Sequence, residues 1–280
     1  MSSHLYLLSS GLLLISVCIS QQCTDGDCFE GHGTYIYEDG SKYTGMFKNG
    51  KKNGEGTFTF SSGSIYIGDY KDDIFHGKGA YRLSDGSEYT GEFINGEVHG
   101  HGIFTGTNGS LYRGNYQNGK KHGQGAYTME NGDRYSGEFT DDTINGSGRV
   151  EKFDGDIYVG DLKDGYYHGA GTYFYTNGSK YVGEFNNGKK NGFGTLTIVN
   201  QSDSEKYVGE FKNDMFDGFG TYTFPDGSIY NGGFKGGLFH GQGLYKLSTG
   251  LQLDGNFNLG NFTGPWLVFP TPSLHDFHYA

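Results

Sequence analysis

Five histidines recur at one position of a repeated pattern, each directly before a glycine: His76, His99, His122, His168 and His240. Imidazole is a common metal ligand and a frequent general acid or base, so the row raises the question of a metal or catalytic site. If each histidine sits on its own β-hairpin, neighbouring copies stand about 10 Å apart, too far for one ion to bind two of them. Other copies of the position hold Asn or Asp, which are common turn residues. The row therefore predicts turns, and the sequence predicts no metal and no cofactor.

The segment GMFKNGKK, residues 45–52, resembles a phosphate-binding loop. Lys52 stands where such a loop needs Ser or Thr to hold magnesium, and no strand-to-helix context surrounds it. Acidic residues also recur at one equivalent position of most repeats, which spaces them along a solvated row. General acid–base chemistry needs carboxyl groups within reach of one substrate. The sequence therefore predicts a protein that is not an enzyme.

The elements that carry these positions form a 23-residue repeat with one three-residue insertion. Each unit opens on Tyr-x-Gly-x-Phe and continues with Gly-x-Gly-x-aromatic, so apolar and polar residues alternate with the period of two that β-strands show. Asn-Gly, Asp-Gly-Ser and similar turn sequences separate the segments. Each unit is therefore predicted to be one β-hairpin with an apolar side. The units begin at Tyr43, Tyr66, Tyr89, Tyr112, Tyr135, Tyr158, Tyr181, Tyr207, Tyr230 and Leu253.

Glycine has a predicted role in packing. The chain of 280 residues holds 52 glycines together with 23 tyrosines and 22 phenylalanines, too many aromatic residues for a disordered chain. Where a strand has no side chain, as at Gly91, Gly100 and Gly102, rings from neighbouring strands can lie across the backbone. We call the side of the hairpins that carries these glycines and rings the aromatic face, and the other side the opposite face.

The pattern Tyr-x-Gly-x-Phe followed by Gly-x-x-x-Gly-x-Gly resembles the MORN repeat. The resemblance implies an all-β fold, an elongated single-layer antiparallel array of about ten 23-residue hairpins that is curved and twisted. It covers residues 43–269, with a C-terminal tail at 270–280. Departures are conservative, such as Leu162 for the Phe and Asp73 for a Gly.

Three lysine pairs recur at a spacing of 69 residues: Lys51 and Lys52, Lys120 and Lys121, Lys189 and Lys190. Units of three types follow one another in a fixed order, and three units of 23 make 69. Duplication of a three-hairpin block explains this spacing without a function. A functional alternative places the pairs about 29 Å apart along one sheet edge, with apolar residues such as Phe75 and Phe216 exposed between them as an interface.

The N-terminus points to the secretory pathway. Residues 1–20 contain an apolar run from Leu5 to Ile19 and predict a cleaved signal peptide, with an uncleaved anchor or a buried strand as alternatives. Residues 21–42 are predicted to form an N-terminal cap with half a repeat. Its two cysteines, Cys23 and Cys28, are predicted to form a local disulfide in an oxidising compartment.

Glycosylation is predicted first at Asn200, in the insertion, and also at Asn108 and Asn177, in turns of the repeat. Together with the signal peptide, these sites predict a secreted or lumenal protein. The alternative is a membrane-associated protein on the cytoplasmic side.

We predict a non-catalytic scaffold that binds a protein partner through its aromatic, concave face. The formal charge of −11 argues against nucleic acid and against anionic lipid. The MORN resemblance nevertheless implies links to phospholipids and the cortical cytoskeleton, so a membrane tether is one alternative. Self-association through unpaired strand edges, giving a homo-oligomer, is another. The residues predicted to contact the partner are Tyr89, Phe93, Tyr112, Tyr116, Tyr135 and Phe139.

Overall fold

The computed structural model describes residues 22–201 and 203–264. The predicted signal peptide and the predicted tail lie outside the described residues. The chain divides into two compact units, residues 1–97 and 98–280. The described residues form strands and no helix, and so contain no helix long and apolar enough to cross a membrane.

The first unit is an open antiparallel sheet in which each strand pairs with the next one along the chain. Its first hairpin carries the disulfide between Cys23 and Cys28, the pair predicted from the sequence. The strands are β1 (Gln22–Gly26), β2 (Gly31–Ile36), β3 (Lys42–Lys48), β4 (Lys51–Thr59), β5 (Ile65–Lys71), β6 (Ile74–Arg82) and β7 (Glu88–Ile94).

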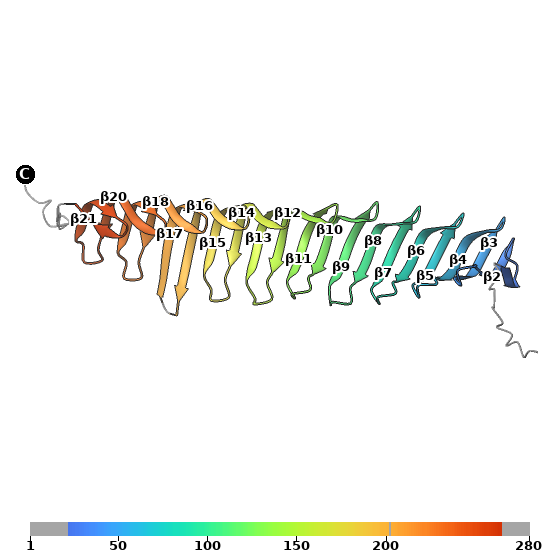
Figure 1. Ribbon diagram of the computed structural model, residues 1–280. Coiled ribbons are helices and arrows are strands. Elements are labelled where there is room, and N and C mark those ends of the chain that lie inside the picture. The colour runs from blue at the N-terminus through green and yellow to red at the C-terminus, as the bar shows by residue number, and fades with distance from the viewer. Residues whose placement is uncertain (1–21, 202, 265–280) are drawn as a thin grey trace, which may run out of the picture. The chain divides into compact units, whose positions relative to one another are not determined.

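The second unit is built in the same way, and Figure 1 shows its hairpins following one another in chain order. Its strands are β8 (Glu97–Thr105), β9 (Leu111–Gln117), β10 (Lys120–Thr128), β11 (Arg134–Thr140), β12 (Thr143–Glu151), β13 (Ile157–Lys163), β14 (Tyr166–Phe174), β15 (Lys180–Asn186), β16 (Lys189–Asn200), β17 (Asp203–Lys212), β18 (Met215–Thr223), β19 (Ile229–Lys235), β20 (Leu238–Lys246), β21 (Gln252–Asn258) and β22 (Asn261–Phe262). The all-β hairpin array predicted from the sequence is thereby confirmed.

Two-residue turns close the hairpins, and both turn residues have positive φ. Asn118 and Gly119 have φ of 50° and 79°, and Asp141 and Asp142 have 47° and 70°. Such turns match the right-handed twist of paired strands, and Asn, Asp and Gly tolerate them best. Asn-Gly and Asp-Asp therefore occur at these turns because their residues tolerate positive φ.

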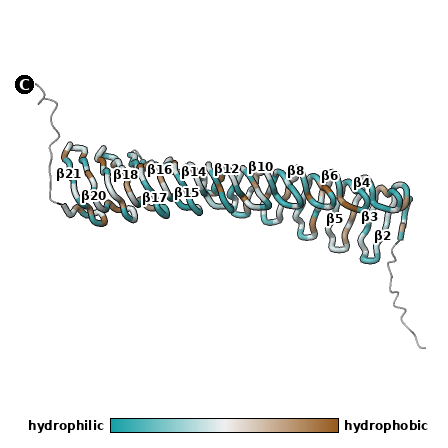
Figure 2. The backbone as a smooth tube through the Cα atoms, turned by 90° about the horizontal axis from the view of Figure 1, so that it is seen from above, coloured by the Kyte–Doolittle hydropathy of each residue, from teal (hydrophilic) through white to brown (hydrophobic). Residues whose placement is uncertain are grey.

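The interior of each unit is a row of tyrosine and phenylalanine rings on the aromatic face. Tyr207 is fully buried, and its ring makes edge-on contacts with Phe211 on the same strand and with Phe234 on the next hairpin, at centroid distances of 5.1 and 5.0 Å. Hydrophobic and hydrophilic segments alternate along the backbone (Figure 2). Each hairpin therefore shares its interior with its neighbours, as expected of a repeat protein that folds as an array.

The predicted role of glycine is confirmed by the tyrosine rings. A Cβ atom added to Gly220 would lie 2.5 Å from the Tyr207 ring, and one on Gly209 would meet both the Tyr207 hydroxyl and the Gly220 backbone. The Tyr207 hydroxyl reaches across the paired glycines and donates to the Glu210 carbonyl at 2.9 Å. The equivalent bond, from a tyrosine to the carbonyl three residues on, occurs at Tyr43, Tyr66, Tyr89, Tyr112, Tyr135, Tyr158, Tyr181 and Tyr230.

The three-residue insertion lengthens one hairpin. Strands β16 and β17 continue their pairing through Ile198–Glu205 and Val199–Ser204 to Asn200–Asp203. This hairpin extends further than its neighbours in Figure 1. The insertion therefore adds ladder pairs and leaves the repeat that follows in register.

Candidate functional site

The two lysines of each pair have different environments. Lys51, Lys120 and Lys189 are exposed, whereas Lys52, Lys121 and Lys190 are partly buried on the aromatic face. The Lys121 ammonium lies 5.4 Å from the Tyr112 ring centroid and 4.7 Å from that of Tyr127. The Lys190 ammonium lies 5.8 Å from the centroids of both Tyr175 and Tyr181. The second lysine of each pair therefore covers a buried tyrosine by a cation–π contact.

In the repeats without a lysine pair, an apolar side chain occupies the same place. Phe216 stacks on Tyr207 and Phe239 stacks on Tyr230, with centroids 3.9 and 3.8 Å apart. In the first compact unit, residues 1–97, Phe75 stacks on Tyr66 with the ring centroids 3.8 Å apart. These side chains are half-buried against their own hairpins. The apolar row is therefore packed on its own hairpins and only partly exposed, and its use as an interface stays a prediction.

Aspartates in the turns explain why lysine is tolerated in this place. Asp73 accepts a hydrogen bond from the Lys52 backbone N–H at 2.9 Å and lies 3.5 Å from the Lys52 ammonium. Asp142 accepts from the backbone N–H of Lys121 in the same way. Elsewhere in the repeat the turn residue is glycine, and only its backbone N–H bonds to the preceding hairpin, as between Gly237 and Phe216. Each lysine is therefore matched by an aspartate on the following hairpin.

Half-buried rings form the accessible surface of the aromatic face. In the second unit we define the ring layer as Phe216, Tyr222, Phe224, Phe239 and Tyr245, all half-buried. Tyr222 and Phe224 have centroids 4.8 Å apart, and Phe224 and Tyr245, on consecutive hairpins, 5.5 Å apart. Because Phe216 and Phe239 stack on buried tyrosines, the layer rests on a packed floor. Phe216 belongs to the apolar row predicted from the sequence, whereas Tyr222, Phe224 and Tyr245 were not singled out, although their position in the repeat identifies them.

The six rings predicted to contact a partner lie beneath the accessible surface. The structure buries Tyr89, Phe93, Tyr112, Tyr116, Tyr135 and Phe139, each 7% exposed or less. Burial raises the pKa of Tyr89, Tyr112 and Tyr135 to about 12. These rings are the floor of the array in their own hairpins, and their direct contact with a partner stays a prediction.

The histidine row does not gather into a metal site in the described part of the chain. No group of three His, Cys, Asp or Glu side chains that could hold an ion occurs among the described residues. His122 and His168 are half-buried on separate hairpins. The acidic row on the opposite face is engaged locally: Glu184 accepts from the Phe193 backbone N–H at 3.1 Å, and Glu210 from that of Phe219 at 3.0 Å.

The predicted glycosylation sites are exposed. Asn200 stands at the end of the extended hairpin, and the last residue of its sequon, Ser202, lies outside the described residues. The Asn177 side-chain oxygen accepts from the Ser179 backbone N–H at 2.9 Å, and Ser179 is buried. Asn108 makes the same turn with Ser110. Occupancy of the three sites stays a prediction.

The repeat geometry defines the class of the protein as a hairpin-repeat array. A family model described as MORN repeat matches the chain at residues 29–42, 43–65, 66–88, 89–111, 112–134, 135–157, 158–180, 181–202, 207–229 and 230–252. The matches cover well over half of the sequence, and the chain belongs to the MORN repeat family. From residue 43 onward their starts coincide with the units read from the sequence, and the half repeat before Tyr43 is matched as well.

No curated protein matches the chain. Similar solved structures include the TCP10 domain of Danio rerio CPAP in complex with a peptide of Danio rerio STIL, with 11% identity, a TM-score of 0.39, and 85% of this chain and 100% of that chain covered. The TCP domain of Drosophila melanogaster SAS-4 with a proline-rich motif of Ana2 has 12% identity and a TM-score of 0.36, and 66% of this chain and 99% of that chain are covered. A streptogramin B lyase has 17% identity and a TM-score of 0.15, and 86% of this chain and 74% of that chain are covered. These TM-scores are too low for the likenesses to bear on function.

Proposed function

We propose that this MORN repeat protein is a non-catalytic scaffold that binds a protein partner through its aromatic face. The observation that carries the proposal is the ring layer, in which aromatic side chains from consecutive hairpins are half-buried and in mutual contact. Aromatic residues are enriched at protein interfaces, where they contribute much of the binding energy.

The ring layer is suited to binding because it is already ordered. Phe216 and Phe239 are held by stacking on Tyr207 and Tyr230, and Phe224 has its ring centroid 6.2 Å from that of Phe239. Rings fixed in this way lose little side-chain entropy when a partner covers them. The buried tyrosines therefore contribute to binding by supporting the layer above them.

Two alternative functions would use the molecule differently. A membrane tether would need the layer to enter a bilayer, and the charge of −11 opposes approach to anionic headgroups. Self-association would use unpaired strand edges instead of the layer. Vesicle co-sedimentation and sedimentation velocity of the purified chain distinguish both from binding to a protein.

We also propose that the repeats work in the secretory pathway. The disulfide between Cys23 and Cys28 supports this, because such bonds persist in oxidising compartments. The exposed Asn200 at the end of an extended hairpin is the first site for a glycan. N-terminal sequencing and glycosidase treatment of the chain made in secretory cells test the proposal. An unprocessed, unglycosylated product would place the repeats on the cytoplasmic side.

Photo-cross-linking tests the protein-binding proposal most directly. A photoreactive residue replaces Tyr245 in the ring layer, and a matched control places it at Phe219, which is 66% exposed on the opposite face. We expect a partner to cross-link from position 245 and not from 219. The double substitution Phe224→Ser and Tyr245→Ser should abolish the cross-link made from a third position, Tyr222. A cross-link that survives the double substitution in a folded chain would contradict the proposal.

A further inference from the structure

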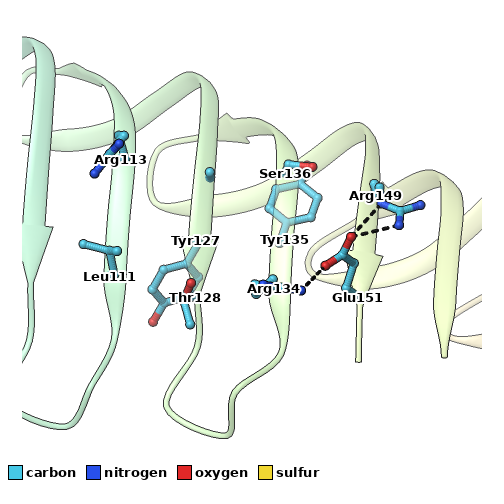
Figure 3. A pocket seen from close by; sticks show the side chains of 10 residues that line it. Leu111, Arg113, Tyr127, Thr128, Arg134, Tyr135, Ser136, Arg149 and Glu151 are labelled. Carbon is cyan, nitrogen blue, oxygen red and sulfur yellow. Dashed lines mark hydrogen bonds and ion pairs between the residues drawn. The ribbon is translucent and has the colours of Figure 1, made fainter. Parts of the chain in front are cut away.

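Three of the four arginines of the chain line one hollow on the opposite face of the second unit (Figure 3). They are Arg113 on β9, Arg134 on β11 and Arg149 on β12. The hollow has a volume of about 490 Å³, and a shallower one of about 790 Å³ beside it shares Arg113 and Arg149. The rare arginines of an acidic protein are thus concentrated in one place.

Strand register creates this hollow. Arg113 lies beside Ala126, Ala126 beside Ser136, and Ser136 beside Arg149, in one row across four strands. Three strand spacings separate the two arginines, about 14 Å along the row. The small side chains of Ala126 and Ser136 form the floor between them. The result is a shallow depression with a guanidinium group at each side.

The fold does not require arginine here. The position of Arg113 is taken by Ser136, Val159 and Val182 in the hairpins that follow, and that of Arg149 by Thr172 and Thr195. Those hairpins keep the same interior and the same pairing. The arginines therefore depart from the repeat without a structural demand for them.

The hollow retains a positive charge after its internal ion pairs are counted. Arg149 Nη2 lies 2.8 Å from Glu151 Oε1, and Arg134 Nη2 lies 2.6 Å from Glu151 Oε2. Hydrogen bonding by Arg149, and then the charge of Arg134, lowers the pKa of Glu151, which keeps it ionised. One carboxylate thus faces two guanidinium groups. Arg113 has no ion pair or hydrogen bond with another described side chain.

Charged residues are distributed unevenly around the hollow. Glu138 and Asp161 lie on the next row towards the hairpin turns, where Gln124 is 3.5 Å from Glu138 and Ser147 donates to Asp161 at 2.8 Å. On the other side of the hollow the row holds Leu111, Thr128, Arg134 and Glu151, the carboxylate paired with the arginines. An anionic group is therefore drawn to the arginine row and away from the acidic one.

We propose that this arginine hollow is a second binding site, which takes an acidic, extended segment of a protein partner. Guanidinium groups bind carboxylates in a two-pronged geometry, and Arg113, which has no side-chain partner among the described residues, is available for such a bond. A short acidic segment responds to the positive charge within one screening length, about 8 Å at physiological salt. A wide anionic membrane surface would instead meet the charge of −11 on the whole chain. The site lies on the face opposite the ring layer and goes beyond the proposed function.

The test uses a fluorophore-labelled Glu-Ala-Glu-Ala-Glu peptide and its Gln-Ala-Gln-Ala-Gln counterpart, with binding followed by fluorescence anisotropy. We expect the double substitution Arg113→Ala and Arg149→Ala to weaken binding of the acidic peptide about tenfold or more, as for the loss of charge-assisted hydrogen bonds. The matched control is Arg82→Ala, which removes the fourth arginine, in the first unit, and should leave binding unchanged. A second variant, Ala126→Glu, keeps the arginines and should block binding by placing a carboxylate on the floor.

Four results would overturn the proposal. Equal binding of the glutamine peptide, or equal affinity of the wild type and the double variant, would show that the arginines do not recognise carboxylates. Failure of the acidic peptide to bind the wild type would exclude it as the ligand class. Binding of phosphatidylserine vesicles that depends on Arg113 and Arg149, without peptide binding, would assign the hollow to a lipid. The Phe224→Ser and Tyr245→Ser variant should retain peptide binding, so failure of this proposal and failure of the ring layer are distinguishable.

Discussion

Lys190 and Asp214, on consecutive hairpins, are joined by three contacts. Asp214 Oδ1 accepts a hydrogen bond from the Lys190 backbone N–H at 2.9 Å and lies 3.7 Å from the Lys190 ammonium. The Asp214 backbone N–H in turn donates to the Lys190 carbonyl at 3.0 Å. The same pairing joins Lys52 to Asp73. The second lysine of the pair and the aspartate of the next turn therefore join neighbouring hairpins.

The two lysines of one pair should respond differently to charge reversal. Lys190→Glu places a carboxylate beside Asp214 and over the Tyr181 ring, in a side-chain position only 17% exposed, and should lower the free energy of unfolding by about 2–3 kcal/mol. Lys189→Glu, at an exposed position, should change it by less than about 0.5 kcal/mol. Urea unfolding of both variants measures the difference. Equal effects would mean that the buried contact contributes nothing.

Alanine at Gly220 should disrupt the interior far more than alanine at Gly227. A Cβ on Gly220 would lie 2.5 Å from the Tyr207 ring, so the ring must move, at a cost of about 3 kcal/mol. A Cβ on Gly227 meets nothing within 4 Å, and its φ of 84° costs about 1 kcal/mol. Chemical denaturation separates the two. If Gly220→Ala were the milder change, tyrosine packing over glycine would not stabilise the array.

The array should lose stability above pH 10. Burial raises the pKa of Tyr112, Tyr135 and Tyr230 to about 12, whereas an unfolded tyrosine ionises near 10. Between these values the unfolded chain has released protons that the folded chain retains, so the contribution of these tyrosines to the free energy of unfolding is fully present below about pH 10 and is lost as pH rises. Denaturation midpoints across this range measure the loss. Complete tyrosinate absorbance near pH 10 with the sheet intact would contradict the burial of these phenols.

Removing the disulfide should have a local effect. The substitutions Cys23→Ser and Cys28→Ser open a short loop, for which chain entropy predicts a cost of about 2 kcal/mol. Because strands contact mainly their neighbours, the cost should be confined to β1 and β2. Hydrogen exchange should accelerate at the amides of Gln22–Gly26 and remain unchanged in β9–β20. Uniform acceleration would instead mean that the array unfolds as one cooperative unit.

Local pattern was sufficient to predict the hairpins, because side-chain direction in a strand follows the period of two. The 23-residue spacing identified the units, and the Tyr and Gly positions identified the aromatic face. The side chains that lie over the buried tyrosines of that face could not be predicted in the same way. Lys190 and Phe216 have opposite hydropathy, yet both lie over a buried tyrosine ring, because a lysine can place its ammonium on the ring and beside an aspartate.

By itself the sequence determined the repeat, the two faces and the disulfide, since each depends on residues within one hairpin. Only the tertiary structure decided which side chains from different hairpins meet. The arginine hollow illustrates this, because Arg113 and Arg149 are 36 positions apart and become neighbours across Ala126 and Ser136 through strand register. Register depends on backbone pairing and on an irregularity that recurs within the hairpins, here between Lys121 and Gly125, which the strand period of two does not record.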